Sequence, residues 1–270
     1  EEVGIFANAT LNELFKQKAA GKGGANLMLL AALRAFEIEA YPVLTSTREH
    51  GRVIPEHAIF DQFDYLLVLA KVNGEAIFLD TGNPMRPLGY PASKSLNYKA
   101  WVVDSKNPHW VDIEIPHSQE VFQVNCKLED GYLKGDIKTK NSGYNALFER
   151  LVYKDNKEGV YWNERISPFA SDFTLKNFEA QNEENIKEEF YNDFSFETDE
   201  LIIENDDILY ISPTLYTNFS ENPFRAKKRY SNIDFPFQFV DRYLFHLEIP
   251  AEYEVEQLPD PVNLVLPDKG

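Results

Sequence analysis

Hydrophobic positions in the first part of the chain follow a helical period and then the pattern of strands. Residues 11–19 and 26–36 have the spacing of helices, and the second is apolar on nearly every face, which predicts a buried helix. Asn73-Gly74 lies between two strand-like segments and is the strongest hairpin signal in the chain. The segments predicted as strands here are Tyr41–Leu44, Tyr65–Val72, Ala76–Leu79 and Trp101–Val103.

Beyond residue 116 the pattern is mainly that of β-structure. Pro116-His117-Ser118 is typical of a linker, so we expect one domain over residues 1–115 and a second over 116–270. Val121–Leu128 and Tyr132–Thr139 alternate on either side of an Asp130-Gly131 turn. Short helices are predicted at Tyr144–Tyr153 and Phe178–Phe190. Further strands are predicted at Phe194–Phe196, Ile208–Ile211, Tyr243–Ile249 and Tyr253–Glu256. The fold class is therefore α+β.

Composition and charge narrow the class of protein. A hydrophobic fraction of 43% with 26% charged residues indicates a globular chain rather than a disordered one. The net charge of −17 has the wrong sign for neutralising phosphates, so we expect no nucleic-acid partner. No apolar run reaches the ~18 residues needed to span a bilayer, and the first residues lack the pattern of a signal peptide. The chain has no initiator Met and stops at Leu266–Gly270 as if within a domain, so we expect a piece of a longer protein.

The first 110 residues resemble the transglutaminase-like branch of the papain-like cysteine hydrolases. The resemblance rests on the order of a buried helix, a strand, a long loop and a strand-Asn-Gly-strand hairpin that ends in Leu79-Asp80-Thr81. In that family a Gly-x-Cys turn precedes the helix, a His opens the second strand, and an Asp follows the third. The resemblance implies a transglutaminase-like domain followed by a β-rich, sandwich-like domain.

Other segments are similar to a bacterial, exported group of multi-domain proteins that contain a transglutaminase-like module and a further N-terminal β domain. These segments are Tyr41–Arg48, Gly143–Ala146 with Arg150, Glu221–Phe224 and Glu254–Pro259. They fall in both halves of the chain, so the resemblance covers most of it. It implies a periplasmic or cell-envelope location.

Cysteine catalysis of this kind needs a thiolate, a neighbouring imidazole and an orienting acid. Aligned position by position, the family cysteine falls on Lys22 or Gly23, and the histidine on Asp64, or on Tyr65 if the register shifts by one. The acid falls on Asp80. Only the acid is retained, and an Asp in place of the histidine could not relay a proton near neutral pH at its usual pKa. We interpret Lys22, Gly23, Asp64 and Asp80 as vestigial triad positions.

Two residues from elsewhere are considered as replacements for the missing groups. Cys126, the single cysteine, is predicted to be an inert strand residue, because free Cys usually behaves as a small hydrophobe. His57 precedes Asp64 by a few residues and is interpreted as a loop histidine that a rearrangement could bring to the site. The remaining histidines lack the spacing of a helical metal pair, so no metal and no cofactor is expected.

The glycine-rich turn before the buried helix allows further readings. Lys22 has glycines on both sides, which favours an exposed turn lysine over a desolvated nucleophile. Gly21–Gly24 could cradle a small anion, but it lacks the form of a P-loop. Asp80-Thr81-Gly82 resembles an aspartic-protease triplet without its second copy, and is interpreted as a strand end. Acidic runs near residues 183–189 and 204–207 lack calcium-loop spacing, and most aromatic residues alternate in strands and are assigned to cores rather than to sugar stacking.

The leading hypothesis is a catalytically inactive transglutaminase-like module with a binding or structural role in an exported bacterial protein. Its ligand could be a peptide, a protein or a glycan. The alternative is an active cysteine peptidase or amidase of the transglutaminase-like type, whose nucleophile the alignment misplaces.

Overall fold

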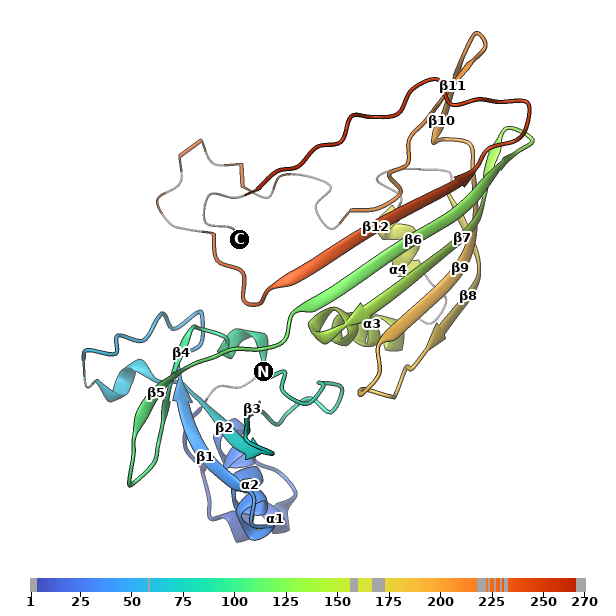
Figure 1. Ribbon diagram of the computed structural model, residues 1–270. Coiled ribbons are helices and arrows are strands. Elements are labelled where there is room, and N and C mark those ends of the chain that lie inside the picture. The colour runs from blue at the N-terminus through green and yellow to red at the C-terminus, as the bar shows by residue number, and fades with distance from the viewer. Residues whose placement is uncertain are drawn as a thin grey trace.

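The protein has an α+β fold with two five-stranded sheets that follow one another along the chain (Figure 1). The structure is a computed structural model that describes residues 4–57, 59–155, 160–166, 173–217, 222, 224–225, 227–228, 230 and 233–265. Its helices are α1 (Leu11–Gln17), α2 (Lys22–Ala35), α3 (Gly143–Asp155) and α4 (Val160–Ile166), with short 3₁₀ turns at Phe60–Gln62 and Ser93–Ser95. No helix in the described ranges is long and apolar enough to cross a membrane.

The first sheet is antiparallel throughout and has the strand order β3-β2-β1-β4-β5. Its strands are β1 (Glu39–Thr45), β2 (Tyr65–Val72), β3 (Glu75–Leu79), β4 (Lys99–Val102) and β5 (His109–Asp112). The predicted turn between β2 and β3 is confirmed: Asn73 and Gly74 have φ of 54° and 86°, values that glycine and asparagine adopt readily. Strand β5 was not among the predicted strands.

Helix α2 packs on one face of this sheet through one side only. Leu30 lies against Ala40 of β1 and against Val68 and Ala70 of β2. The prediction of a helix buried on nearly every face is wrong, because the alanines at positions 31, 32 and 35 face solvent and Phe36 is 80% exposed. The alanines and leucines reflect high helix propensity as well as burial. The helix also begins at Lys22, before the predicted start at residue 26.

The second sheet has the order β12-β6-β7-β9-β8, with β12 parallel to β6 and the other pairs antiparallel. Its strands are β6 (Ser118–Glu129), β7 (Tyr132–Ser142), β8 (Thr174–Gln181), β9 (Phe190–Thr198) and β12 (Phe239–Glu248). A separate hairpin pairs β10 (Ile202–Asn205) with β11 (Ile208–Ile211). Alternate residues of β6 and β9 are buried, so one face of the sheet forms a core.

The layer on that face consists of helices, loops and the β10–β11 hairpin, whose Ile202 and Ile211 pack against the same core. Trp162 and Ile166 of α4 pack with Phe122, Ile137 and Phe194 from three strands, and α3 contacts β6, β7 and β9. Within the described residues this face carries no second large sheet, so the arrangement differs from the expected sandwich. The physical reason is that α3 and α4 supply the apolar surface that a second sheet would have provided. Helix α4 and strands β8 and β10 were not predicted.

Two predicted elements of this half are wrong. Phe178–Phe190 was predicted as a helix, but its first residues belong to β8 and the rest form a loop before β9. Asn182 has φ of 63° there, and the buried guanidinium of Arg150 binds three carbonyls of the loop, those of Asn182, Asn185 and Glu188. Tyr253–Glu256 has no strand partner in the described chain and follows β12 as exposed coil.

A polar and aromatic junction joins the two halves. The hydroxyl of Tyr144 donates to the Pro91 carbonyl at 2.6 Å, and its ring lies against Tyr90 and stacks on Phe237. Gly143 precedes this residue with φ of 59°, and a Cβ there would lie 2.9 Å from the Tyr90 ring. Glycine is thus needed at this position both for its conformation and for its close contact.

Candidate active site

Asp80 forms the centre of the candidate site. It follows β3 directly, and its side chain is 0% exposed. The carboxylate oxygens contact five groups: Lys22 Nζ at 2.7 Å, Arg86 Nη1 at 2.5 Å, the Ala92 backbone N–H at 2.8 Å, the Tyr65 hydroxyl at 3.0 Å and Asn26 Nδ2 at 3.0 Å. These groups come from α2, β2 and the loop after β3. One carboxylate therefore ties three parts of the domain together.

Lys22 occupies one of the two positions aligned with the family cysteine. It is the first residue of α2, its side chain is 6% exposed, and its ammonium group binds both Asp80 and the Thr81 carbonyl. The expectation of an exposed turn lysine is therefore wrong. The helix begins early enough to include Lys22, and Gly82 leaves room for its ammonium group, because a Cβ at Gly82 would lie 2.9 Å from Lys22 Nζ.

Gly23, the other position aligned with the cysteine, has no room for a side chain. A Cβ built there would lie 2.6 Å from the Phe6 carbonyl oxygen and 2.8 Å from the Ile5 carbonyl carbon, both of which are backbone atoms. Real Cβ atoms do not approach backbone so closely, so the N-terminal segment would have to move to admit a thiol. At the start of α2, Lys22 is therefore engaged in an ion pair with Asp80, and the backbone of Ile5 and Phe6 packs against Gly23.

The two possible registers for the family histidine lead to different places. The Tyr65 hydroxyl donates to Asp80, so the side chain at one of the two aligned positions contacts this carboxylate. Asp64 points elsewhere: its carboxylate accepts hydrogen bonds from the backbone N–H and the hydroxyl of Thr47, each at 2.6 Å. Of the two registers, only the one through Tyr65 places a side chain on Asp80.

Electrostatics fix Asp80 in its ionised form. Burial by itself raises the pKa of this carboxyl, but the Arg86 guanidinium and the hydrogen bonds from Lys22 and Asn26 outweigh it and lower the pKa below the ordinary value. A carboxylate held by two cations accepts a proton reluctantly, and an ammonium group engaged in an ion pair has no lone pair with which to attack. The arrangement favours structural bridging over proton transfer or nucleophilic chemistry.

Sequence reasoning missed Asn26 and Arg86. The Asn26 amide group donates to the Leu66 carbonyl at 2.6 Å and to Asp80, while its oxygen accepts from the backbone N–H and the hydroxyl of Thr81 at 2.8 Å each. A buried amide that satisfies both its donors and its acceptor pins α2 to the end of β3. A polar residue inside a run of apolar helix formers was the signal that could have identified Asn26. Arg86 lies in an irregular loop and carried no such signal.

The two considered replacement residues lie away from Asp80. Cys126 is buried in the core of the second sheet, and burial raises the pKa of its thiol to about 11, which disfavours the reactive thiolate. His57 is exposed in the loop before β2, where its carbonyl accepts a hydrogen bond from Gln62. No hydrogen bond or ion pair among the described residues connects either one with Lys22, Tyr65 or Asp80.

A second buried ion cluster lies in the core of the second sheet. Arg165 of α4 contacts Glu149 of α3 at 2.6 Å and Glu120 of β6 at 3.5 Å. Tyr161 donates to Glu149, and Tyr216 donates to Glu120. Burial raises the pKa of Glu149 to about 7; Arg165 opposes this rise and the neighbouring Glu120 adds to it. Two carboxylates thus share one guanidinium inside the protein.

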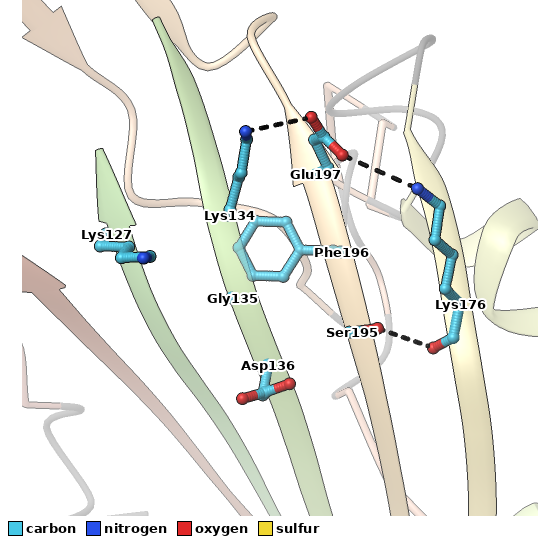
Figure 2. A pocket seen from close by; sticks show the side chains of 8 residues that line it. All are labelled: Lys127, Lys134, Gly135, Asp136, Lys176, Ser195, Phe196 and Glu197. Carbon is cyan, nitrogen blue, oxygen red and sulfur yellow. Dashed lines mark hydrogen bonds and ion pairs between the residues drawn. The ribbon is translucent and has the colours of Figure 1, made fainter. Parts of the chain in front are cut away.

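The opposite face of the second sheet carries a shallow hollow of about 300 Å³. Figure 2 shows that its side chains come from β6, β7, β8 and β9, with Glu197 between Lys134 and Lys176 at 3.6 Å and 3.7 Å. Asp136 and Ser195 complete the polar lining together with Lys127. These charges are partly exposed and mutually compensated, and such ion pairs contribute at most about 1 kcal/mol each. Nothing in this hollow resembles a catalytic constellation.

In the described part of the chain, no group of three or more His, Cys, Asp or Glu side chains is placed to hold a metal ion. The ionic groups around Asp80 are mainly cationic, which is the wrong charge for such a site.

Comparisons with known proteins identify one segment. Residues 207–268 match a domain family of unknown function that has a solved structure, DUF3858. The match contains β11, β12 and the exposed coil that follows β12. Comparisons with curated proteins and with solved structures gave no match. The matched family carries no assigned activity, and its segment lies outside the Asp80 site.

Proposed function

We propose that the chain is a catalytically inactive, transglutaminase-like module joined to a β-rich domain, with a binding or structural role in an exported bacterial protein. The observation that carries the proposal is the buried contact of Lys22 and Tyr65 with Asp80. Lys22 and Tyr65, at positions aligned with a catalytic cysteine and histidine, both bind the Asp80 carboxylate and fix its position. The element order from α2 to β3 supports the family resemblance, although fold alone does not define function.

The contacts of Lys22 and Tyr65 with Asp80 stabilise the fold and do not serve catalysis. Breaking a buried ion pair by removing one partner typically costs about 3–5 kcal/mol, because the remaining charge stays buried. A triad in an active enzyme instead needs a nucleophile that reaches substrate and a base that can exchange protons. Lys22 and Asp80 are almost completely buried and neither presents such a group to solvent.

The test combines activity and stability measurements on matched variants. Peptide hydrolysis and incorporation of a primary amine into a glutamine-containing protein would be measured for the unaltered chain, for Asp80→Asn and for Cys126→Ser. The exposed Asp136→Asn on the second sheet serves as the control. We expect no turnover in any sample and a lower unfolding midpoint only for Asp80→Asn. Turnover that disappears in a folded Asp80→Asn or Cys126→Ser variant would overturn the proposal.

A further inference from the structure

Five aromatic side chains form a continuous row on the first domain. We call the set the aromatic row; its members are Phe6, Phe60, Phe63, Trp110 and Trp101. Successive ring centroids are 5.8, 6.5, 5.9 and 5.2 Å apart. Phe6 is 71% exposed and Phe60 is 51% exposed, so the row reaches the surface at one end. The expectation that aromatic residues serve mainly the cores of sheets does not hold for this set.

The row lies on the face of the first sheet that also carries α2. Side chains alternate along a strand, and Ala40 of β1 faces α2, so Leu44 lies on that same face. Leu44 is paired with Trp101 of β4, and Trp101 is paired with Trp110 of β5. Helix α2 packs on β1 and β2. The aromatic rings therefore cover the part of this face that lies over β4 and β5.

The loop beside the row adds apolar and acidic groups. Ile54 and Ile59 are half exposed in the segment that leads into Phe60. Glu56 and Asp61 of this segment are exposed as well. An exposed apolar patch with a polar rim is typical of an interaction surface. The acidic rim and the chain's net charge of −17 favour a basic partner and disfavour a second copy of the chain.

The edge of the sheet indicates the form of that partner. Strand β5 pairs with β4 on one side, and no strand of the described chain pairs with its other side. An extended peptide can add to such an edge through main-chain hydrogen bonds while alternate side chains reach one face. The tilt between neighbouring rings, from 32° to 70°, leaves no flat platform of the kind on which a sugar stacks.

We infer that the aromatic row, the edge of β5 and the acidic loop form a docking surface for an extended polypeptide segment in which apolar and basic side chains alternate. The inference rests on the proposed function as a binding module and names its partner class. Apolar side chains of the segment pack against the rings of the row, and its basic side chains face Glu56 and Asp61.

The test uses two dye-labelled synthetic peptides of equal length and charge, one alternating lysine with leucine and one alternating lysine with serine. Fluorescence anisotropy at physiological salt measures their binding. We expect the leucine peptide to bind at least about tenfold more tightly, and Phe6→Ala and Phe60→Ala each to weaken it about tenfold. Phe36→Ala removes an aromatic that is 80% exposed but lies outside the row, and it leaves binding unchanged. Phe6 and Phe60 are mainly exposed, so their variants keep the fold.

The contribution of the acidic rim, Glu56 and Asp61, can be tested separately through the salt dependence of binding. The double variant Glu56→Gln, Asp61→Asn should weaken the leucine peptide mainly at low salt, because exposed charges act chiefly through long-range attraction. Equal binding of both peptides, or equal loss in Phe36→Ala, overturns the inference. So does binding of a β-linked glucan oligosaccharide through the row in place of the peptide. Turnover in the activity assays would refute the proposed function without altering these binding results, so the two failures are distinguishable.

Discussion

Replacing Glu149 with glutamine should remove much of the pH dependence of stability between weakly acidic and neutral pH. The ordinary pKa of a glutamate is 4.5, and burial raises that of Glu149 to about 7. The folded state therefore holds this proton more tightly than the unfolded state does. Stability from this group is fully present below pH 4.5 and is lost as the pH rises through about 7.

The magnitude follows from the difference of about 2.5 pH units, which at about 1.4 kcal/mol per unit corresponds to roughly 3 kcal/mol. Glutamine keeps an oxygen that can accept the hydrogen bonds from Arg165 and Tyr161, but it does not ionise. Relative to the unaltered chain, Glu149→Gln should thus gain about 2–3 kcal/mol between pH 5 and pH 8. The variant gains this stability because it has no buried carboxyl to ionise beside Glu120, with which Glu149 shares the Arg165 guanidinium.

Urea unfolding at a series of pH values, followed by tryptophan fluorescence, measures the effect. Trp162 lies 4.4 Å from the Arg165 guanidinium and reports directly on this part of the core. Glu197→Gln provides the control, because it removes a partly exposed carboxylate from the opposite face of the same sheet. The reasoning is refuted if Glu149→Gln shows the same dependence of unfolding free energy on pH as the unaltered chain, or if Glu197→Gln shows the same change.

Three further changes test the first domain and its junction. Asp80→Ala should cost about 3–5 kcal/mol in urea unfolding, because Lys22 and Arg86 stay buried without their carboxylate; a loss as small as that of an exposed carboxylate would contradict this structural role of Asp80. The lowered pKa of Asp80 also means that its contribution is present above pH 3.8 and is lost on acidification below that value, which acid titration of ellipticity can check. Gly23→Cys should lower the thermal midpoint and create no thiol-dependent turnover, since its Cβ meets the Phe6 backbone; an unchanged midpoint would disprove the steric argument. Tyr144→Phe should cost about 1 kcal/mol by removing the hydrogen bond to Pro91, as measured by calorimetry, and no loss would mean that this bond does not stabilise the junction.

Local signals in the sequence were enough for the hairpins and for most strands. Asn73-Gly74 and Asp130-Gly131 both have positive φ at the turns they predict, because glycine and its neighbour decide that geometry themselves. The loop after β8 shows the limit of such signals. Its glutamates have helical propensity, but the side chain of Arg150 binds its carbonyls from more than 30 residues away, and no local pattern contains that contact.

The candidate site shows the same limit more sharply. The position of Asp80 at the end of a strand could be predicted, since it depends on the hairpin before it. The burial of Lys22 could not, because its carbonyl partner Thr81 lies 59 residues later in the chain. Adjacent glycines indicated freedom and exposure, whereas in the fold Gly23 allows the N-terminal segment to pack against the helix. Conformational freedom and close packing require the same residue type, and sequence alone does not distinguish them.

The parallel pairing of β12 with β6 affects how the chain folds. Phe239 is opposite Ser118, so the second sheet is completed by a contact that closes a loop of more than one hundred residues. Such non-local pairing is slow, because the chain must lose the entropy of closing that loop before the contact forms. Until β12 arrives, the long edge of β6 stays open to pairing with other chains. Within the segment that matches DUF3858, β12 thus completes a sheet whose other strands come earlier in the chain, and a chain truncated before β12 should aggregate during synthesis.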